Sequence, residues 1–325
     1  VGVIGCMAER LKEKLVEGPH GVDVVAGPDA YRDLPRLVRE AEAGGKGVNV
    51  LLSTEETYAE IAPVRLDRNG VSAFVAIMRG CNNFCHYCIV PYTRGRERSR
   101  DVESILREVH DLSDRGFKEV TLLGQNVNSY KGEDAEGRRW DFSDLIYRIN
   151  AIDGLQRIRF MTSHPKDLSD ELIEVMKNSD KICRHLHLPL QSGSTKILKA
   201  MNRRYTKEQY LELAAKIRRE IPDISLTTDI MVGFPGETAE DVDDTIDVIR
   251  KVGFDNAFTF IYSVRTGTPA AAMEQVPEEE VHAGFDRVLE AVQETARKQV
   301  ARLQGQTLTA LVEEVNEQDA SLVTG

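Results

Sequence analysis

The sequence predicts an α/β protein whose main part is a partial barrel of six strand–helix units, a (β/α)6 arrangement. Six short apolar runs that fit β-strands alternate with amphipathic helical patterns between residues 73 and 262. Such alternation is typical of parallel α/β folds. Polar, glycine-rich segments follow several of these strands, at the end where barrel enzymes place their active sites. Six units are too few for a complete eightfold barrel.

Residues 1–62 predict part of a smaller α/β domain in front of the barrel. We expect strands at 1–4, 22–25 and 48–52, with helices from about residue 7 and across 34–42. The segment opens directly on a strand and has no initiator Met, so we expect this domain to continue upstream of Val1. A polar connection with Pro63 then separates it from the barrel.

The barrel strands follow in regular order. We expect them at residues 73–78, 119–123, 157–161, 185–190, 224–232 and 257–262. Between them lie helical stripes, one of which runs from Val102 and stops at Gly116, while Thr206 and Gln209 form a capping box that opens another. Residues 281–303 predict a long amphipathic helix, and strand-like alternation follows at 307–315. The chain therefore divides into domains at 1–62, 63–303 and 304–325.

Composition places the chain among globular proteins of a reducing compartment. Of its 325 residues, 41% are hydrophobic and 29% are charged, which gives ample material for a core. No run approaches the roughly 18 apolar residues that a membrane helix needs, and the first residues lack the features of a signal peptide. The five cysteines, three of them clustered, favour metal ligation in the cytoplasm over a disulfide framework.

The clustered cysteines are the most informative feature. Cys81, Cys85 and Cys88 are spaced C-x3-C-x2-C, so one short loop can direct three thiolates at one metal centre. A closed structural site needs four ligands, whereas a reactive site keeps one position open. On an iron–sulfur cluster, three cysteines would leave one iron free for a substrate. The alternative is a zinc knuckle completed by His86 or by the distant Cys183.

The cysteine loop resembles the signature of the radical S-adenosylmethionine (SAM) enzymes. It reads RGCNNFCHYCIVP, with Tyr87 as the aromatic residue before the last cysteine. The resemblance implies the open six-unit barrel and a 4Fe-4S cluster on Cys81, Cys85 and Cys88, whose open iron binds SAM. One electron then converts SAM to methionine and a 5'-deoxyadenosyl radical, while the protein supplies positioning and a dry pocket.

The same resemblance implies further SAM contacts at the ends of the other strands. The segment GQNVNSY follows the second strand, where relatives bind the amino group of SAM, and Arg204 is expected to grip its carboxylate in a two-point fork. The turn GFPGET after the fifth strand is expected to admit the adenine. The expected cofactor-binding residues are Tyr87, Gln125, Asn126, Gln191, Arg204, Asp229, Gly233 and Glu237.

The segment GCMAER, which contains Cys6, narrows the resemblance to the methylthiotransferases. In these enzymes three cysteines of the amino-terminal domain hold a second, auxiliary 4Fe-4S cluster. Cys6 would be the last of them, and we expect the other two upstream of Val1. Residues 304–325 would then open a TRAM domain, a small β-barrel that binds tRNA.

The implied activity is the transfer of a methylthio group to carbon 2 of N6-(dimethylallyl)adenosine beside the tRNA anticodon. One SAM would donate the methyl group and a second would give the radical. The expected partners are the anticodon stem-loop and a one-electron reductant such as flavodoxin, and the sulfur donor stays open. We expect a cytoplasmic monomer without a membrane partner.

The basic run YTRGRERSR has a charge balance of +3 in a chain of net charge −11. A patch of this kind can hold phosphates although the whole chain is acidic. We therefore expect Arg94, Arg96 and Arg98 to bind loop phosphates of the RNA.

Two rival functions stay open. The substrate could be a threonylcarbamoyl-adenosine tRNA or a ribosomal-protein aspartate, although the segment GQNVNSY argues against both. The chain could instead be a zinc-stabilised RNA-binding module without catalysis.

Overall fold

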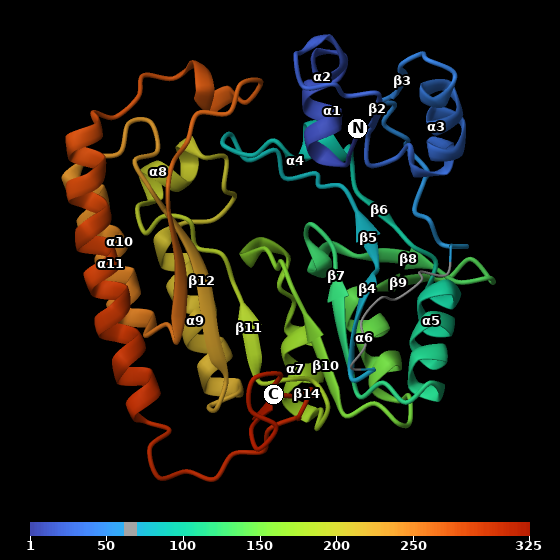
Figure 1. Ribbon diagram of the computed structural model, residues 1–325. Coiled ribbons are helices and arrows are strands. Elements are labelled where there is room, and N and C mark those ends of the chain that lie inside the picture. The colour runs from blue at the N-terminus through green and yellow to red at the C-terminus, as the bar shows by residue number, and fades with distance from the viewer. Residues whose placement is uncertain (62–69) are drawn as a thin grey trace.

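The computed structural model describes residues 1–61 and 70–325. The proposed boundary at 62 and 63, including Pro63, lies outside these residues. In Figure 1 a small amino-terminal unit stands beside the upper end of a larger unit in which strands and helices alternate. In the described part of the chain, no helix has the length and apolar character needed to cross a membrane.

The amino-terminal unit is a three-stranded parallel sheet with helices, as predicted. Its strands β1 (Gly2–Ile4), β2 (Val24–Ala26) and β3 (Gly47–Asn49) pair in that order. Its helices are α1 (Cys6–Leu11), α2 (Lys14–Glu17) and α3 (Leu34–Glu42), and the 3-10 turn η1 (Tyr31–Asp33) precedes α3.

The six barrel strands are present and parallel. One sheet contains β4 (Ser72–Ala76), β7 (Glu119–Leu123) and β10 (Arg157–Phe160), and a second contains β11 (His185–His187), β12 (Ser225–Val232) and β13 (Asn256–Ile261). A single bridge between Ile158 and Ile182 joins the two sheets. The strands thus follow one another around the partial barrel in chain order, as the sequence predicts.

Helices follow the strands and close the core. They are α5 (Val102–Asp114), α6 (Phe142–Asn150), α7 (Asp170–Asn178), α8 (Thr195–Ala200), α9 (Lys207–Glu220), α10 (Ala239–Val252) and α11 (Glu278–Ala301). The predicted capping box of Thr206 and Gln209 begins α9, and a second, from Thr238 and Asp241, begins α10. Because each cap satisfies backbone N–H groups directly after a loop, it determines where the loop ends.

Smaller elements complete the chain. The 3-10 turns are η2 (Val127–Ser129), η3 (Pro165–Asp167) and η4 (Pro269–Ala272). Two hairpins are formed by β8 (Lys131–Glu133) with β9 (Arg139–Asp141), and by β14 (Glu314–Val315) with β15 (Val323–Thr324). The last hairpin is the only strand pair in the described part of 304–325, so the TRAM assignment stays a prediction.

Two strands differ from their predicted lengths for local reasons. The run 73–78 divides, because the chain leaves the parallel ladder after β4 and pairs as β5 (Met78–Arg79) with the antiparallel β6 (Arg98–Ser99). The run 185–190 is regular only to His187, because Pro189 has no N–H to donate to a ladder. Gln191 resumes the pairing with Ile230.

A buried carboxylate joins the amino-terminal unit to the barrel. The Asp29 side chain is fully buried. Its Oδ1 lies 3.1 Å from Nη2 of Arg79, and its Oδ2 lies 3.0 Å from Nη1 of Arg98. These arginines face each other across the β5–β6 ladder. The two units are therefore connected at the base of the cysteine loop.

Replacing Asp29 tests this connection. The Asp29→Ala variant leaves two largely buried guanidinium groups unpaired, and breaking buried pairs in this way costs about 3–5 kcal/mol. We expect a loss of that order in the free energy of unfolding, measured by denaturant titration. The control is Asp243→Ala, which removes the surface partner of Arg287 and should cost less than about 1 kcal/mol. Equal losses in the two variants would contradict the role of Asp29.

Candidate active site at the carboxyl ends of the barrel strands

The cysteine loop leaves the barrel after β5 and returns as β6, so its two ends meet. Gly80 has a φ of 78°, and a Cβ atom there would lie 2.0 Å from the carbonyl oxygen of Arg96. Only glycine permits this approach. The Gly80 N–H donates to Oε1 of Gln125 at 2.7 Å, and the Cys81 N–H donates to the Gly95 carbonyl at 3.2 Å. The base of the loop is thereby closed and held against the loop after β7.

The three thiols of the loop lie in an environment that water scarcely reaches. Cys81 and Cys85 are buried and Cys88 is partly buried. Burial raises the pKa of Cys81 to about 11 and also raises the pKa of Cys88, and the neighbouring thiols add to both shifts. Metal binding therefore has to displace thiol protons at neutral pH.

The thiols fit a cluster with one cysteine per iron. In the described part of the chain, no three His, Cys, Asp or Glu side chains are grouped closely enough to hold one metal ion. In a 4Fe-4S cluster each cysteine binds a different iron, so its ligands need not meet at one point. The zinc alternative loses one of its two candidate fourth ligands, because Cys183 precedes β11 at the opposite end of the strands. The other candidate, His86, has its Nδ1 2.7 Å from the Ala200 carbonyl.

A buried arginine next to the thiols was missed by the sequence analysis, which chose its neighbour Arg204. Arg203 donates through Nη2 to the Pro189 carbonyl at 2.7 Å and through Nε to the Tyr205 hydroxyl at 2.9 Å. Its Nη1 lies 3.7 Å from Sγ of Cys85 and 3.5 Å from the Tyr87 hydroxyl. The sequence of two adjacent arginines does not show which of the two side chains points inward.

The surroundings of Arg203 keep it charged. Burial alone would lower its pKa, but Tyr205, Tyr87 and Cys85 outweigh that effect, and the pKa of Arg203 stays well above its ordinary value. This positive charge lies beside Cys85. Arg203 therefore stabilises negative charge at the site.

The predicted SAM-binding residues occupy the same end of the barrel, and a first group lies directly after β7. Gln125 supports Gly80, as described above. Asn126 is buried and donates to Oδ2 of Asp167 at 2.7 Å, while its Oδ1 has no hydrogen-bond partner in the described part of the chain. An unpaired buried acceptor is costly. The Oδ1 atom of Asn126 is therefore a candidate acceptor for a donor such as an amino group.

The second group lies around the turn after β12. Tyr87 packs in one apolar cluster with Phe234 of that turn, so the cysteine loop and the turn are in contact. Gly233 has a φ of 81°, and a Cβ there would lie 2.7 Å from Val281. Its N–H donates to the carboxylate of the buried Glu237. Glu237 thus holds the turn closed, which is a different task from the cofactor contact expected of it.

Gln191 and Asp229 are connected through their backbones. The Gln191 N–H donates to the Asp229 carbonyl at 2.8 Å, and Gln191 has a φ of 69°, which is unusual for a residue with a side chain. The Asp229 carboxylate lies 3.4 Å from Nε2 of His187. Strain of this kind is found where the surrounding structure holds a residue in place for a purpose.

A cleft of about 510 Å³ opens beside the cysteine loop. Asn82 and Asn83 of that loop line it, together with Asn128 after β7 and the exposed Arg204. The contributing segments come from the ends of successive strands. Arg204 therefore faces the site although its guanidinium, unlike that of Arg203, is not buried.

The arginines of the basic run have four different environments. Arg94 donates through Nε to Sγ of Cys6 at 3.1 Å, which brings the amino-terminal unit against α4 (Val90–Arg94), the helix directly after the cysteines. Arg96 is exposed and lies over the ring of Phe84. Arg98 is buried on Asp29 and the Ser53 carbonyl. The prediction that Arg98 binds RNA phosphates is therefore wrong, because its donors are used inside the protein.

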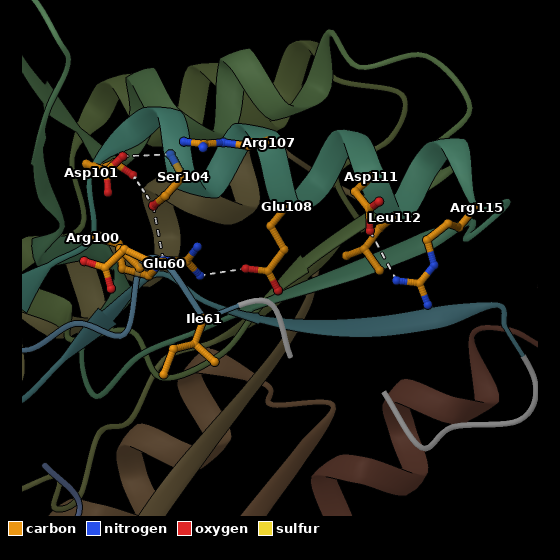
Figure 2. Close-up of a pocket in the computed structure, with 11 residues that line it drawn as sticks. Glu60, Ile61, Arg100, Asp101, Ser104, Arg107, Glu108, Asp111, Leu112 and Arg115 are labelled. Atoms are coloured by element: carbon orange, nitrogen blue, oxygen red, sulfur yellow. Dashed lines mark hydrogen bonds and ion pairs between the residues drawn. The ribbon is translucent and has the colours of Figure 1, made fainter. Parts of the chain in front are cut away.

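The side chain of Arg100 also has its partners inside the protein. Figure 2 shows it in a cleft of about 500 Å³ along α5, where its Nη1 lies 2.7 Å from a carboxylate oxygen of Glu108. Because Arg98 and Arg100 are both buried, the positive charge that the run offers to solvent is smaller than the sequence suggests.

Comparison with known proteins identifies the class. The model of the radical SAM superfamily matches residues 75–249, and the chain belongs to this superfamily. Among solved structures, the radical SAM methyltransferase TsrM from Kitasatospora setae superposes with a TM-score of 0.63 at 18% identity. The aligned part covers 83% of this chain and 57% of TsrM. At this sequence identity the likeness supports the fold alone.

Curated relatives place the chain more narrowly. The tRNA-2-methylthio-N(6)-dimethylallyladenosine synthase of Phocaeicola vulgatus is 53% identical over 327 residues, which cover 100% of this chain and 71% of that protein. The enzyme of the same name from Parabacteroides distasonis is 52% identical over 315 residues, or 96% of this chain and 68% of that protein. Within the superfamily, the chain belongs to the family of these synthases.

Arg203 can be tested by its effect on the cluster's reduction potential. In Arg203→Gln the positive charge beside Cys85 is lost, so we expect the midpoint potential to fall by on the order of tens of millivolts. The measurement is a redox titration followed by electron paramagnetic resonance. Arg204→Gln is the matched control, because its guanidinium is exposed, and its potential should be unchanged. Identical shifts in both variants would contradict the assignment.

Glu237 should make stability depend on pH. Burial raises the pKa of Glu237 to about 7, against the opposing effect of the Gly233 N–H. A carboxyl whose folded pKa is raised contributes its full stability below its unfolded pKa and loses it as the pH rises through 7. Glu237→Gln stays neutral, so we expect it to be more stable than the wild type at pH 8 by up to about 3 kcal/mol. Denaturant titration at pH 5 should show little difference, and a constant difference at both pH values would reject this account.

Proposed function

We propose that this chain adds a methylthio group to carbon 2 of N6-(dimethylallyl)adenosine beside the anticodon of tRNA. One observation carries the proposal: the loop of Cys81, Cys85 and Cys88 is closed at the carboxyl end of a radical SAM barrel, with Cys81 and Cys85 buried and Cys88 partly buried. Two relatives, which are 53% and 52% identical over 100% and 96% of this chain, are both named tRNA-2-methylthio-N(6)-dimethylallyladenosine synthase.

The residues of the loop would hold the 4Fe-4S cluster. When bound, this cluster and SAM supply the one-electron chemistry that gives a carbon radical. Arg203 holds positive charge beside Cys85, and Gly80 with Gln125 fixes the loop's base. Buried surroundings exclude water, which a reactive radical requires.

The same pocket would orient SAM from two sides. Asn126 offers its unpaired Oδ1 to the amino group, and Arg204 offers a guanidinium to the carboxylate. Tyr87, Gln191, Asp229 and Gly233 frame the adenine side, with Glu237 holding the turn. The role of Arg204 is supported by its place in the cleft beside the cysteine loop. The other roles are supported by the position of the residues at the strand ends.

Cys6 would be a ligand of the auxiliary cluster. Support comes from its position at the start of α1, where Arg94 donates to its sulfur at 3.1 Å. Since α4 follows Cys88 directly, this contact brings Cys6 toward the radical-forming loop. A hydrogen bond of this kind also tunes a cluster ligand. The phosphate-binding role of Arg94 stays a prediction.

The substrate chemistry fits this division of labour. Carbon 2 of adenine has an unacidic C–H bond, so acid–base groups would help little and a carbon radical is a suitable abstractor. The base must leave its stack, which costs a few kcal/mol in a duplex and less in a loop. We further propose a cytoplasmic monomer that receives its electron from a reductant such as flavodoxin, with a TRAM domain that begins at residue 304.

Hydrogen abstraction from carbon 2 gives a direct test. The chain is reconstituted anaerobically with iron and sulfide, reduced, and supplied with SAM and an N6-(dimethylallyl)adenosine stem-loop that carries deuterium at carbon 2. We expect mass spectrometry to find the deuterium in 5'-deoxyadenosine. Cys85→Ala should abolish formation of 5'-deoxyadenosine, whereas Cys183→Ala, which lies at the other end of the barrel, should retain iron and activity.

The outcomes separate the rival functions. Deuterium transfer from a threonylcarbamoyl-adenosine stem-loop, or turnover only with a ribosomal-protein aspartate, would move the substrate within the family. A folded protein that binds zinc in place of iron and sulfide, and forms no 5'-deoxyadenosine, would favour the RNA-binding module.

A further inference from the structure

The outer side of the cysteine loop carries two aromatic rings and a guanidinium group in mutual contact. The rings of Phe84 and Tyr92 meet edge to face, with centroids 6.0 Å apart. The Arg96 guanidinium carbon lies 5.5 Å from the centroid of the Phe84 ring. We call these three residues the aromatic cluster.

The aromatic cluster is open to solvent. Tyr92 is 43% exposed, and Arg96 is exposed as well. No hydrogen bond or ion pair engages the side chain of Tyr92 or of Arg96 in the described part of the chain. Both side chains are therefore available to a partner, in contrast to the buried Arg98 and Arg100.

The backbone holds Phe84 in an unfavourable conformation. Its φ is 49°, a region that bulky residues rarely adopt. The amide of Asn202, from the loop after α8, donates to the carbonyls of Asn83 at 3.2 Å and Phe84 at 3.0 Å. Asn202 itself has a φ of 59°. Two segments far apart in the sequence thus combine to hold the turn that presents the Phe84 ring.

The chemistry of the aromatic cluster matches unpaired RNA bases. Splayed bases of single-stranded loops stack on aromatic rings and on the plane of arginine, and the positive charge of Arg96 complements the adjoining phosphates. A folded-protein partner would need a larger apolar surface than one exposed tyrosine. Asn82 and Asn83, which precede Phe84, line the cleft beside the cysteine loop. An RNA strand that lies on the aromatic cluster therefore also reaches this cleft.

We infer that Phe84, Tyr92 and Arg96 form a stacking platform for an unpaired anticodon-loop base that flanks the modified adenosine. The inference rests on the proposed function, because that function supplies an RNA loop at this site. Withdrawing the target base from its stack leaves its neighbours without a stacking partner. The platform replaces that partner and holds the loop open while the target base lies at the site.

The test compares variants in RNA binding and in base stacking. The probe is an anticodon stem-loop with the fluorescent base 2-aminopurine next to the N6-(dimethylallyl)adenosine, and binding to the iron-loaded chain is followed by anisotropy. In Tyr92→Ala we expect about tenfold weaker binding, the size of one lost base–aromatic stack, and loss of the 2-aminopurine quenching. Tyr92→Phe keeps the ring and should bind within about twofold of the wild type.

A second variant separates stacking from charge. Arg96→Lys keeps the positive charge but removes the planar guanidinium, so we expect weaker quenching with an unchanged salt dependence of binding. Iron and sulfide content, measured in each variant, shows that the cluster is retained. A fully paired RNA of the same length should bind all variants alike.

The results distinguish this inference from the proposed function. If the wild type binds the stem-loop and transfers deuterium while Tyr92→Ala binds and quenches equally well, the stacking platform is wrong and the function stands. If the wild type shows no preference for the stem-loop over the paired RNA, both are overturned.

Discussion

The close approach of Gly80 to the backbone of Arg96 is the contact on which the site depends. A loop that must direct three thiols at one cluster has little regular secondary structure, so its shape has to be imposed from outside. The missing side chain of Gly80 lets the two ends of the loop meet, and the short β5–β6 ladder secures them. Gln125 after β7, and the adjacent Asn202 and Arg203 after α8, then hold the loop from two different segments. Loss of any one support leaves the others in place, which suits a loop that must keep its geometry before metal binds.

Positive charge is concentrated around this loop although the whole chain is acidic. Arg79 and Arg98 meet the buried Asp29 at the base, Arg203 lies against Cys85, and Arg94 against Cys6. Thiolates and a SAM carboxylate are anions, and a poorly solvated pocket would reject them without such partners. Of these arginines, Arg79, Arg94 and Arg98 also connect the amino-terminal unit to the barrel. The arginines near the loop therefore both supply positive charge at the site and hold the unit that contains Cys6 against it.

The run YTRGRERSR shows how one charge pattern serves several tasks. Its alternating arginines leave the backbone in different directions, so one reaches Cys6, one an aromatic ring, one Asp29 and one Glu108. Arg96 is exposed, Arg94 is half-buried, and Arg98 and Arg100 are buried. An RNA contact of the run would therefore rest mainly on Arg96 and its two aromatic neighbours, and stacking contributes where charge alone is too small.

The sequence alone determined the elements of the fold and the chemistry of the centre. Periodicity located all six barrel strands because apolar alternation is a local property, and C-x3-C-x2-C predicted a three-thiol centre because its spacing lies within one loop. What tertiary structure decided is which polar side chains point inward. Arg203 and Arg204 are neighbours with equal charge, yet only Arg203 reaches Cys85, because the turn after α8 rotates one toward the barrel and the other into the cleft. Arg98 likewise gives no local sign of Asp29, 69 residues away, since the sequence does not encode the docking of two units at any single position.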